Sequence, residues 1–236
     1  MRITLIIPAK NEEKNILHLL RKLPDSVHEI IVIDGNSTDN TFSVANEYSK
    51  TIKVIKQKTK GKGAALSRGF CLATGDFIIT IDADGSNDPN EIQNFIEGFQ
   101  KGFQLVKGSR YLSGGGSEDI TWFRSLGNIF LTNLVNLLYN KKWSDLAYGY
   151  IGISKDLLDK LKISNFDEPN SSKFKYGSGF EIEALICCRA IKKGAKIIEI
   201  PSFEKSRVYG SSNLKSIPDG IRALFAIIYE KFKFKD

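Results

Sequence analysis

Asp82 and Asp84 follow an apolar run and are separated by a single alanine. Alternate residues of an extended chain point to the same side, so the two carboxylates are predicted to face one way. Their hard oxygens suit Mg²⁺ or Mn²⁺, because such ions favour one or two carboxylates together with the phosphates of a substrate. Taken alone, the same tripeptide is at least as typical of a solvated acidic turn.

The segments before and after this motif alternate between β-rich and helical patterns. The predicted strands span residues 3–7, 29–33, 52–55 and 77–81, and the predicted helices span residues 12–23, 38–48 and 63–73. This order is typical of an α/β fold with a mostly parallel, Rossmann-like sheet. The strands are continuous Ile/Val runs, which indicates that helices cover both faces of the sheet.

Three polar loops follow the first, second and fourth predicted strands: Pro8–Glu13, Asp34–Asp39 and Asp82–Asp84. The carboxyl ends of parallel strands meet at one edge of a sheet, and ligands of open α/β sheets bind in the crevice beyond that edge. The three loops are therefore predicted to converge on one binding site.

A glycine-rich segment, Gly61–Arg68, opens the third predicted helix. It either presents the helix N-terminus to an anion or forms a plain turn. The chain lacks the Gly-x-Gly-x-x-Gly pattern after the first strand, which argues against a dinucleotide-binding Rossmann fold. It also lacks the Gly-x-x-x-x-Gly-Lys-Ser/Thr pattern, which excludes a P-loop.

The chain has 236 residues, of which 42% are hydrophobic and 26% charged, which excludes a disordered or fibrous protein. We expect one domain over residues 1–236, with halves at 1–110 and 111–236. The second half is predicted to contain helices at 122–139, 180–191 and 218–232, a strand at 196–200 and a polar loop at 165–175. Three cysteines without metal-ligand spacing favour a reducing cytoplasm.

Seven segments, taken in order, resemble a family 2 glycosyltransferase of the GT-A fold. They are Pro8–Glu13, Ile33–Thr41, Gly61–Leu66, Asp82–Asp84, Gly108–Tyr111, Glu199–Ser202 and Arg207–Asn213. Within that family the chain is similar to the branch of dolichol-phosphate mannose synthases and other polyprenyl-phosphate sugar transferases. The resemblance extends over nearly the whole chain.

The resemblance implies a binding site for a nucleotide-diphosphate sugar in the half at 1–110, with the acceptor side at 111–236. The implied donor-side residues are Pro8, Ala9, Asn11, Glu12, Asp34, Lys62, Asp82, Arg110 and Arg124, and the implied ligands of Mg²⁺ or Mn²⁺ are Asp82 and Asp84. The family commonly has two consecutive aspartates after the second strand, whereas Gly35 follows Asp34 here. The base therefore stays open among uridine, guanosine and deoxythymidine.

Asp145, Glu183 and Arg207 are the implied catalytic residues. Asp145 matches an acidic residue near the acceptor and is the expected base if that acceptor is a hydroxyl. Glu181 and Glu183 cannot share one helix face, and the resemblance favours Glu183 at the site. Arg110, Arg124 and Arg207 match arginines that hold anionic groups, for which a guanidinium supplies a rigid fork of donors.

The expected activity is metal-dependent, inverting transfer of one sugar to an acceptor, with a polyprenyl phosphate at a membrane surface as the implied acceptor. No nucleic-acid partner is expected. Two alternatives remain: a sugar-nucleotide-binding protein without transferase activity, and a sugar-phosphate nucleotidyltransferase, which also presents paired aspartates on an α/β sheet.

The C-terminal segment combines apolar residues at helical spacing with Arg222, Lys231, Lys233 and Lys235. From Arg189 onward, 11 Lys and Arg face 5 Asp and Glu. The predicted helix either packs on the domain or rests on anionic lipid as a basic amphipathic helix. Its apolar run is too short to cross a bilayer.

Overall fold

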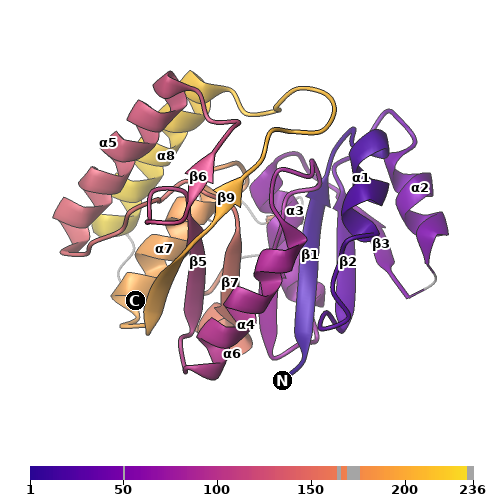
Figure 1. Ribbon diagram of the computed structural model, residues 1–236. Helices are drawn as coiled ribbons and strands as arrows, with labels where there is room; N and C mark the ends of the chain where they lie inside the picture. Colours follow the sequence, from indigo (N-terminus) through magenta and orange to yellow (C-terminus); the bar gives the residue numbers. More distant parts are fainter. Residues whose placement is uncertain (50, 164–165, 169–175, 233–236) are drawn as a thin grey trace.

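The computed structural model describes residues 1–236 except positions 50, 164–165, 169–175 and 233–236. A seven-stranded sheet in the order β3-β2-β1-β4-β7-β5-β8 forms its centre (Figure 1). Its strands are β1 (Ile3–Ala9), β2 (Glu29–Asp34), β3 (Lys53–Lys56), β4 (Phe77–Thr80), β5 (Leu105–Ser109), β7 (Ile151–Ser154) and β8 (Ile197–Pro201). A small second sheet pairs β6 (Gly116–Ser117) with β9 (Phe203–Glu204).

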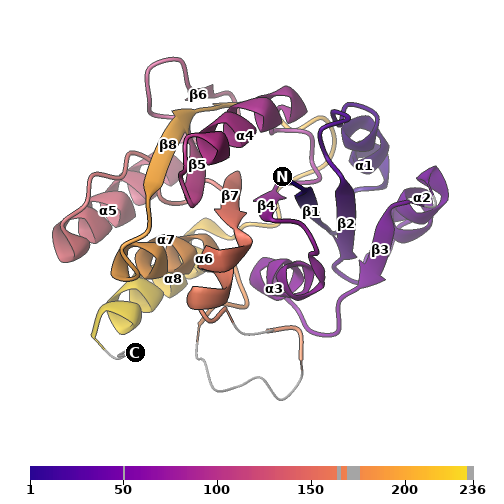
Figure 2. The same ribbon diagram turned by 90° about the horizontal axis from the view of Figure 1, so that it is seen from below.

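Helices cover both faces of the large sheet, as Figure 2 shows from below. One face carries α1 (Glu13–Leu20), α2 (Thr41–Tyr48), the short 3₁₀ helix η1 (Pro89–Glu91) and α4 (Ile92–Gln100). The other face carries α3 (Lys62–Leu72), α5 (Trp122–Tyr139), α6 (Lys155–Lys160), α7 (Ile182–Lys192) and α8 (Ser216–Phe232). The predicted α/β fold with a mostly parallel sheet is confirmed.

The strands β1 to β4 are parallel, and their registers align Ala9 with Asp34 and Ile6 with Thr80. The sequence prediction omitted β5, β7, α4 and α6. It also missed that β7 runs antiparallel between β4 and β5. One sheet therefore joins the two predicted halves, because β7 comes from the second half and lies beside β4 of the first.

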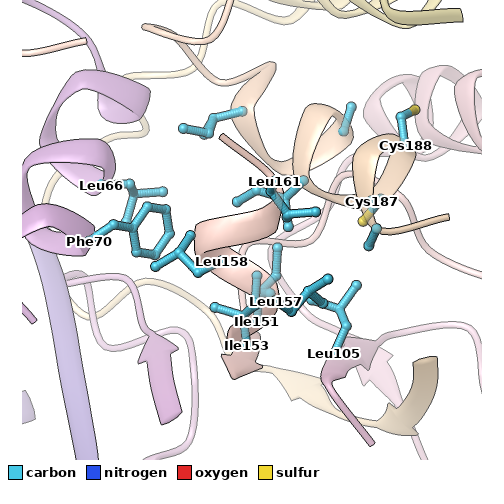
Figure 3. Close-up of a cluster of buried hydrophobic side chains, with 14 of the residues drawn as sticks. Leu66, Phe70, Leu105, Ile151, Ile153, Leu157, Leu158, Leu161, Cys187 and Cys188 are labelled. Carbon is cyan, nitrogen blue, oxygen red and sulfur yellow. The ribbon is translucent and has the colours of Figure 1, made fainter. Parts of the chain in front are cut away.

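The core between the sheet and the helices α3, α5, α6, α7 and α8 is built from aliphatic and aromatic side chains (Figure 3). Leu66 and Phe70 of α3 lie on one side of Leu158 of α6, and Cys187 of α7 lies on the other. Cys187 and Cys188 are buried free thiols. Burial of such side chains is the main force that holds helices on a sheet.

The C-terminal helix α8 packs beside α5 and α7 (Figure 1). It buries Ala226 and Ile227, and its Glu230 carboxylate pairs with Arg189 of α7 at 3.1 Å. Its other face is exposed and apolar, so the two predicted roles of this helix are not exclusive. In the described part of the chain, no helix has the length and apolar character needed to cross a bilayer.

The predicted loop at 165–175 and the basic residues Lys233 and Lys235 fall largely outside the described residues. Two other predicted charges of α8 already have partners. Arg222 donates to Glu181 at 2.8 Å, and the Lys231 ammonium lies 4.9 Å from the ring centre of Tyr139.

Candidate active site

A cavity of about 740 Å³ opens beyond the carboxyl ends of β1 and β4 and continues between α5 and α8. Most of the residues predicted from sequence line it, although they come from distant segments. They are Pro8, Ala9, Glu12, Lys62, Asp82, Asp84, Arg110, Arg124, Glu183 and Arg207. Asn11, Asp34 and Asp145 lie outside its wall.

Asn11 and Asp34 shape the loops behind the cavity. Asn11 adopts a left-handed backbone conformation, and its side-chain oxygen accepts the backbone N–H of Thr38 at 2.8 Å. The Asp34 carboxylate accepts the backbone N–H of Ser37 through Oδ2, while its buried Oδ1 has no hydrogen-bond partner among the described residues. The Asn11 contact ties the loop after β1 to the loop after β2, and the Asp34 contact lies within the second of these loops.

Lys62 joins two carboxylates at the start of α3. Its Nζ lies 2.7 Å from Asp82 Oδ1 and 3.0 Å from Glu183 Oε1. Burial alone would lower the pKa of Lys62, but the two negative charges outweigh it and raise the pKa. Burial also raises the pKa of Glu183, although Lys62 opposes that shift. Lys62 is therefore a fixed positive charge beside Asp82.

Arg207 forms a second bridge across the cavity wall. Its Nη1 lies 2.6 Å from Glu12 Oε1, and its Nη2 lies 2.8 Å from Asp84 Oδ2. Asp84 Oδ1 accepts both the backbone N–H and the hydroxyl of Ser86. Burial raises the pKa of Glu12 despite its contacts with Asn15 and Arg207.

The aspartate motif differs from its predicted geometry. The strand β4 ends at Thr80, so Asp82 and Asp84 lie in the loop that follows it, not on the strand. Both carboxylates still line the cavity, with side chains 32% and 15% exposed. Among the described residues there is no cluster of three or more His, Cys, Asp or Glu side chains arranged for a metal. Two hard carboxylates fit an Mg²⁺ or Mn²⁺ ion whose coordination is completed by phosphate and water.

Asp145 is fully buried beneath the cavity and is bonded to Arg110. Its Oδ2 accepts the Arg110 backbone N–H and Nε–H at 3.1 and 2.7 Å. Its Oδ1 accepts Arg110 Nη2 at 3.0 Å and Asn128 Nδ2 at 2.8 Å. Burial alone would raise the pKa of Asp145, but Arg110 outweighs it and lowers the pKa. Both oxygens are occupied, so the geometry favours a positioning role over the expected role as a base.

Arg110, which follows β5, and Arg124 of α5 also line the cavity. The Arg110 guanidinium, 6% exposed, also contacts Glu204 at 3.0 Å. Arg124, in the first turn of α5, contacts Asp119 at 3.4 Å and is 23% exposed. Beyond them the cavity wall becomes apolar, with Phe123, Phe130, Leu131, Ile217, Ile221 and Leu224 contributed by α5 and α8.

The glycine-rich segment before α3 does not present a free helix N-terminus. The carbonyl oxygen of Ser178 accepts the N–H of Ala64, and a Cβ at Gly63 would lie 2.0 Å from the carbonyl oxygen of Gly177. The loop at 177–179 therefore occupies the position at the N-terminus of α3 where the sequence allowed an anion to bind. The side chain of Lys62, not the helix end, faces the cavity.

Glu204 and Asn128 were missed in the sequence reading. Glu204 lies just beyond the Glu199–Ser202 motif and balances the charge of Arg110. Asn128 is one of three polar residues spaced four apart in the largely apolar helix α5, together with Thr132 and Asn136. That spacing was the available signal, because four residues bring side chains to one face of a helix.

Comparisons with known proteins agree with this arrangement. Residues 4–162 match the family model described as glycosyl transferase family 2. The chain is 29% identical to a dolichol-phosphate mannosyltransferase of Pyrococcus furiosus, over 91% of this chain and 60% of that protein. It is also 29% identical to a polyprenol monophosphomannose synthase of Mycolicibacterium smegmatis, over 90% of this chain and 81% of that one. The chain thus spans about three fifths of the Pyrococcus protein's length.

Among solved structures, glucosyl-3-phosphoglycerate synthase from Mycobacterium tuberculosis shares the fold. Its complex with Mn²⁺, uridine diphosphate and glucosyl-3-phosphoglycerate matches with a TM-score of 0.73 at 20% identity, over all of this chain and 81% of that one. Its complex with Mg²⁺ and uridine diphosphate matches with a TM-score of 0.72 at 20% identity, over all of this chain and 80% of that one.

Proposed function

Because the chain belongs to glycosyl transferase family 2, we propose that it transfers one sugar from a nucleotide-diphosphate sugar to a lipid-linked phosphate, with inversion. The names of the Pyrococcus and Mycolicibacterium relatives support a polyprenyl phosphate as the acceptor. The cavity supports it as well, since its wall combines paired acidic and basic side chains with apolar side chains of α5 and α8.

On the donor side, we place the nucleoside beside Pro8 and Ala9 and the diphosphate beside Lys62 and Arg207. All four residues line the cavity. Asp82 and Asp84 would hold Mg²⁺ or Mn²⁺ in exchange for their contacts with Lys62 and Arg207. The ion would neutralise the leaving diphosphate. The structures of the Mycobacterium neighbour with either ion support divalent metal use in this fold. Lys62 and Arg207 add positive charge at the same end, where charge develops as the sugar departs.

The contacts of the cavity carboxylates are the observation on which the choice between a phosphate and a hydroxyl acceptor rests. Each carboxylate on the described cavity wall already pairs with a Lys or Arg side chain or accepts a backbone N–H. These carboxylates are Glu12, Asp82, Asp84, Asp119, Glu183, Glu204 and Asp219. A hydroxyl acceptor would need one of them as a general base. A phosphate acceptor is ionised at neutral pH and needs none, so the arrangement favours a phosphate.

In the proposed reaction, a phosphate oxygen of the acceptor attacks the anomeric carbon opposite the leaving group. The bond from that carbon to the donor diphosphate breaks, and the nucleoside diphosphate leaves with the electron pair. Arg110 and Arg124 supply guanidinium donors for the acceptor phosphate. No proton has to be removed from the nucleophile in this step.

The apolar end of the cavity supports a lipid tail on the acceptor and peripheral contact with a membrane. Large apolar side chains are exposed along α5 and α8, which lie side by side. They are Trp122, Phe123, Leu126, Ile129, Phe130 and Leu137 of α5, and Ile217, Ile221, Phe225, Ile228 and Phe232 of α8. Exposed apolar surface of this extent marks a binding site on a globular domain.

The test is product analysis with a panel of nucleotide sugars and Mn²⁺, with and without polyprenyl phosphate. We expect release of nucleoside diphosphate and a glycosylated lipid only when the acceptor phosphate is present. Transfer to hydroxyl acceptors but not to polyprenyl phosphate would overturn the acceptor. Release of pyrophosphate from a sugar phosphate and a nucleoside triphosphate would instead identify a nucleotidyltransferase, and donor binding without turnover would identify a binding protein.

A further inference from the structure

The segment at 143–147 is held almost entirely by side chains. Five consecutive backbone N–H groups, from Trp143 to Ala147, each donate to a side-chain oxygen and not to another backbone group. The acceptors are Asn136 Oδ1 at 2.7 Å, Glu199 Oε2 and Oε1 at 2.8 and 3.0 Å, Thr132 Oγ1 at 3.1 Å and Asn128 Oδ1 at 3.0 Å. The conformation of this segment is therefore set by four side chains outside it.

Three of those side chains form a ladder on α5. Asn128, Thr132 and Asn136 are spaced four residues apart, so they lie one above another along one face of the helix. Asn136 also donates its amide to the carbonyl oxygen of Trp143 at 2.8 Å. Asn128 and Thr132 are 4% and 3% exposed, so water does not replace these contacts.

Glu199 holds the segment from the opposite side. Both of its oxygens accept from consecutive residues, Ser144 and Asp145. It belongs to the Glu-Ile-Pro-Ser motif of β8, which the proposed reaction does not otherwise use. An amide at this position would offer one oxygen and one NH₂ group, so a glutamine would leave one of the two N–H groups facing another donor.

The segment in turn holds the Arg110 guanidinium through Asp145. Three Arg110 nitrogens, the backbone N, Nε and Nη2, donate to this one carboxylate, and Asn128 donates to the same carboxylate. We propose that Asn128, Thr132, Asn136 and Glu199 are positioning residues of the transferase, which fix Asp145 and through it the place of Arg110 in the cavity.

Thr132 offers the cleanest perturbation. Valine has nearly the same shape as threonine but lacks the oxygen that accepts the N–H of Leu146, whereas serine keeps that oxygen. Because the inference rests on the proposed transferase activity, the test compares Thr132→Val in two backgrounds, the wild type and Arg110→Lys. A lysine cannot reproduce the forked contact with Asp145.

We expect Thr132→Val to lower kcat/KM for the acceptor by about tenfold or more in the wild-type background, since a small displacement of a binding group is costly. In the Arg110→Lys background the same change should alter kcat/KM by less than about twofold, because coupled residues are not additive. Thr132→Ser should restore most of the rate. Glu199→Gln should lower kcat/KM in the same way as Thr132→Val. It replaces Thr132→Val in the test if the valine variant folds poorly.

The matched control is Asn133→Val on the exposed side of α5, which should leave kcat/KM unchanged in both backgrounds. Thermal unfolding of each variant reports the structural cost of Thr132→Val separately from its effect on activity. Equal fold-losses of activity in the two backgrounds would overturn the positioning role, even with the transferase activity intact. Absence of any transfer by the wild type would instead overturn the proposed function.

Discussion

Replacing Asp145 by asparagine tests the assignment of this residue as the anchor of Arg110. The carboxylate is completely buried and accepts four hydrogen bonds, three of them from Arg110. Asparagine keeps one oxygen and turns an NH₂ group toward the arginine. Breaking a buried ion pair on one side costs about 3–5 kcal/mol. We expect a loss toward the lower end of that range, because Glu204 still contacts Arg110 at 3.0 Å. In a chain of this size that loss lowers Tm by about 6–20 °C.

The pH dependence gives an independent check on the same variant. Arg110 lowers the pKa of Asp145, even though burial opposes the shift. A carboxylate whose folded pKa is lowered stabilises the protein above its unfolded pKa of about 3.9, and this contribution is lost as pH falls through the folded pKa. The difference in unfolding free energy between wild type and Asp145→Asn should therefore be complete at pH 7 and shrink below about pH 4.

Urea unfolding, followed from pH 7 to the lowest pH at which the wild type stays folded, measures both quantities. The control is Asp156→Asn, which removes an exposed carboxylate that pairs with Lys160 within α6. That change should cost less than about 1 kcal/mol, as is usual for exposed pairs. A cost below about 1 kcal/mol for Asp145→Asn, or a difference that grows as the pH falls below about 4, would refute the assignment.

Three further predictions concern the metal, the membrane and the packing of α3. A chelator should abolish transfer, and Mn²⁺ or Mg²⁺ should restore it. Calorimetry should find no metal-dependent donor binding in the Asp84→Asn variant. Full activity in excess chelator would contradict the metal role. The protein should co-sediment with anionic vesicles at low salt and less at high salt, because basic groups near an anionic bilayer contribute about 1 kcal/mol each. Phe225→Asp should weaken this binding. Binding that does not depend on salt would argue against electrostatic contact with the membrane. Gly63→Ala should destabilise the fold by about 1–3 kcal/mol, because the added Cβ meets a carbonyl oxygen at 2.0 Å, whereas Gly127→Ala on α5 meets nothing within 4 Å and should be neutral or stabilising in urea unfolding.

Much of the first half follows from local sequence patterns. Apolar β-branched runs alternate with amphipathic segments there, and parallel strands necessarily bring their carboxyl ends to one edge. That reasoning is enough to place Pro8, Glu12, Asp82 and Asp84 on a common cavity. It does not reach β7, whose place and antiparallel direction depend on its two neighbours, β4 and β5.

The charge partners of the site were decided only by the tertiary structure. The sequence shows that Asp145 is negatively charged and Arg110 positively charged. Only the folded chain buries Asp145 and pairs it with Arg110. The same is true of Gly63, where a carbonyl group from a distant loop takes the position open to an anion. Residue types determine which contacts are chemically allowed. Which of them form depends on pairings between segments far apart in the chain, and a local pattern contains no information about those pairings.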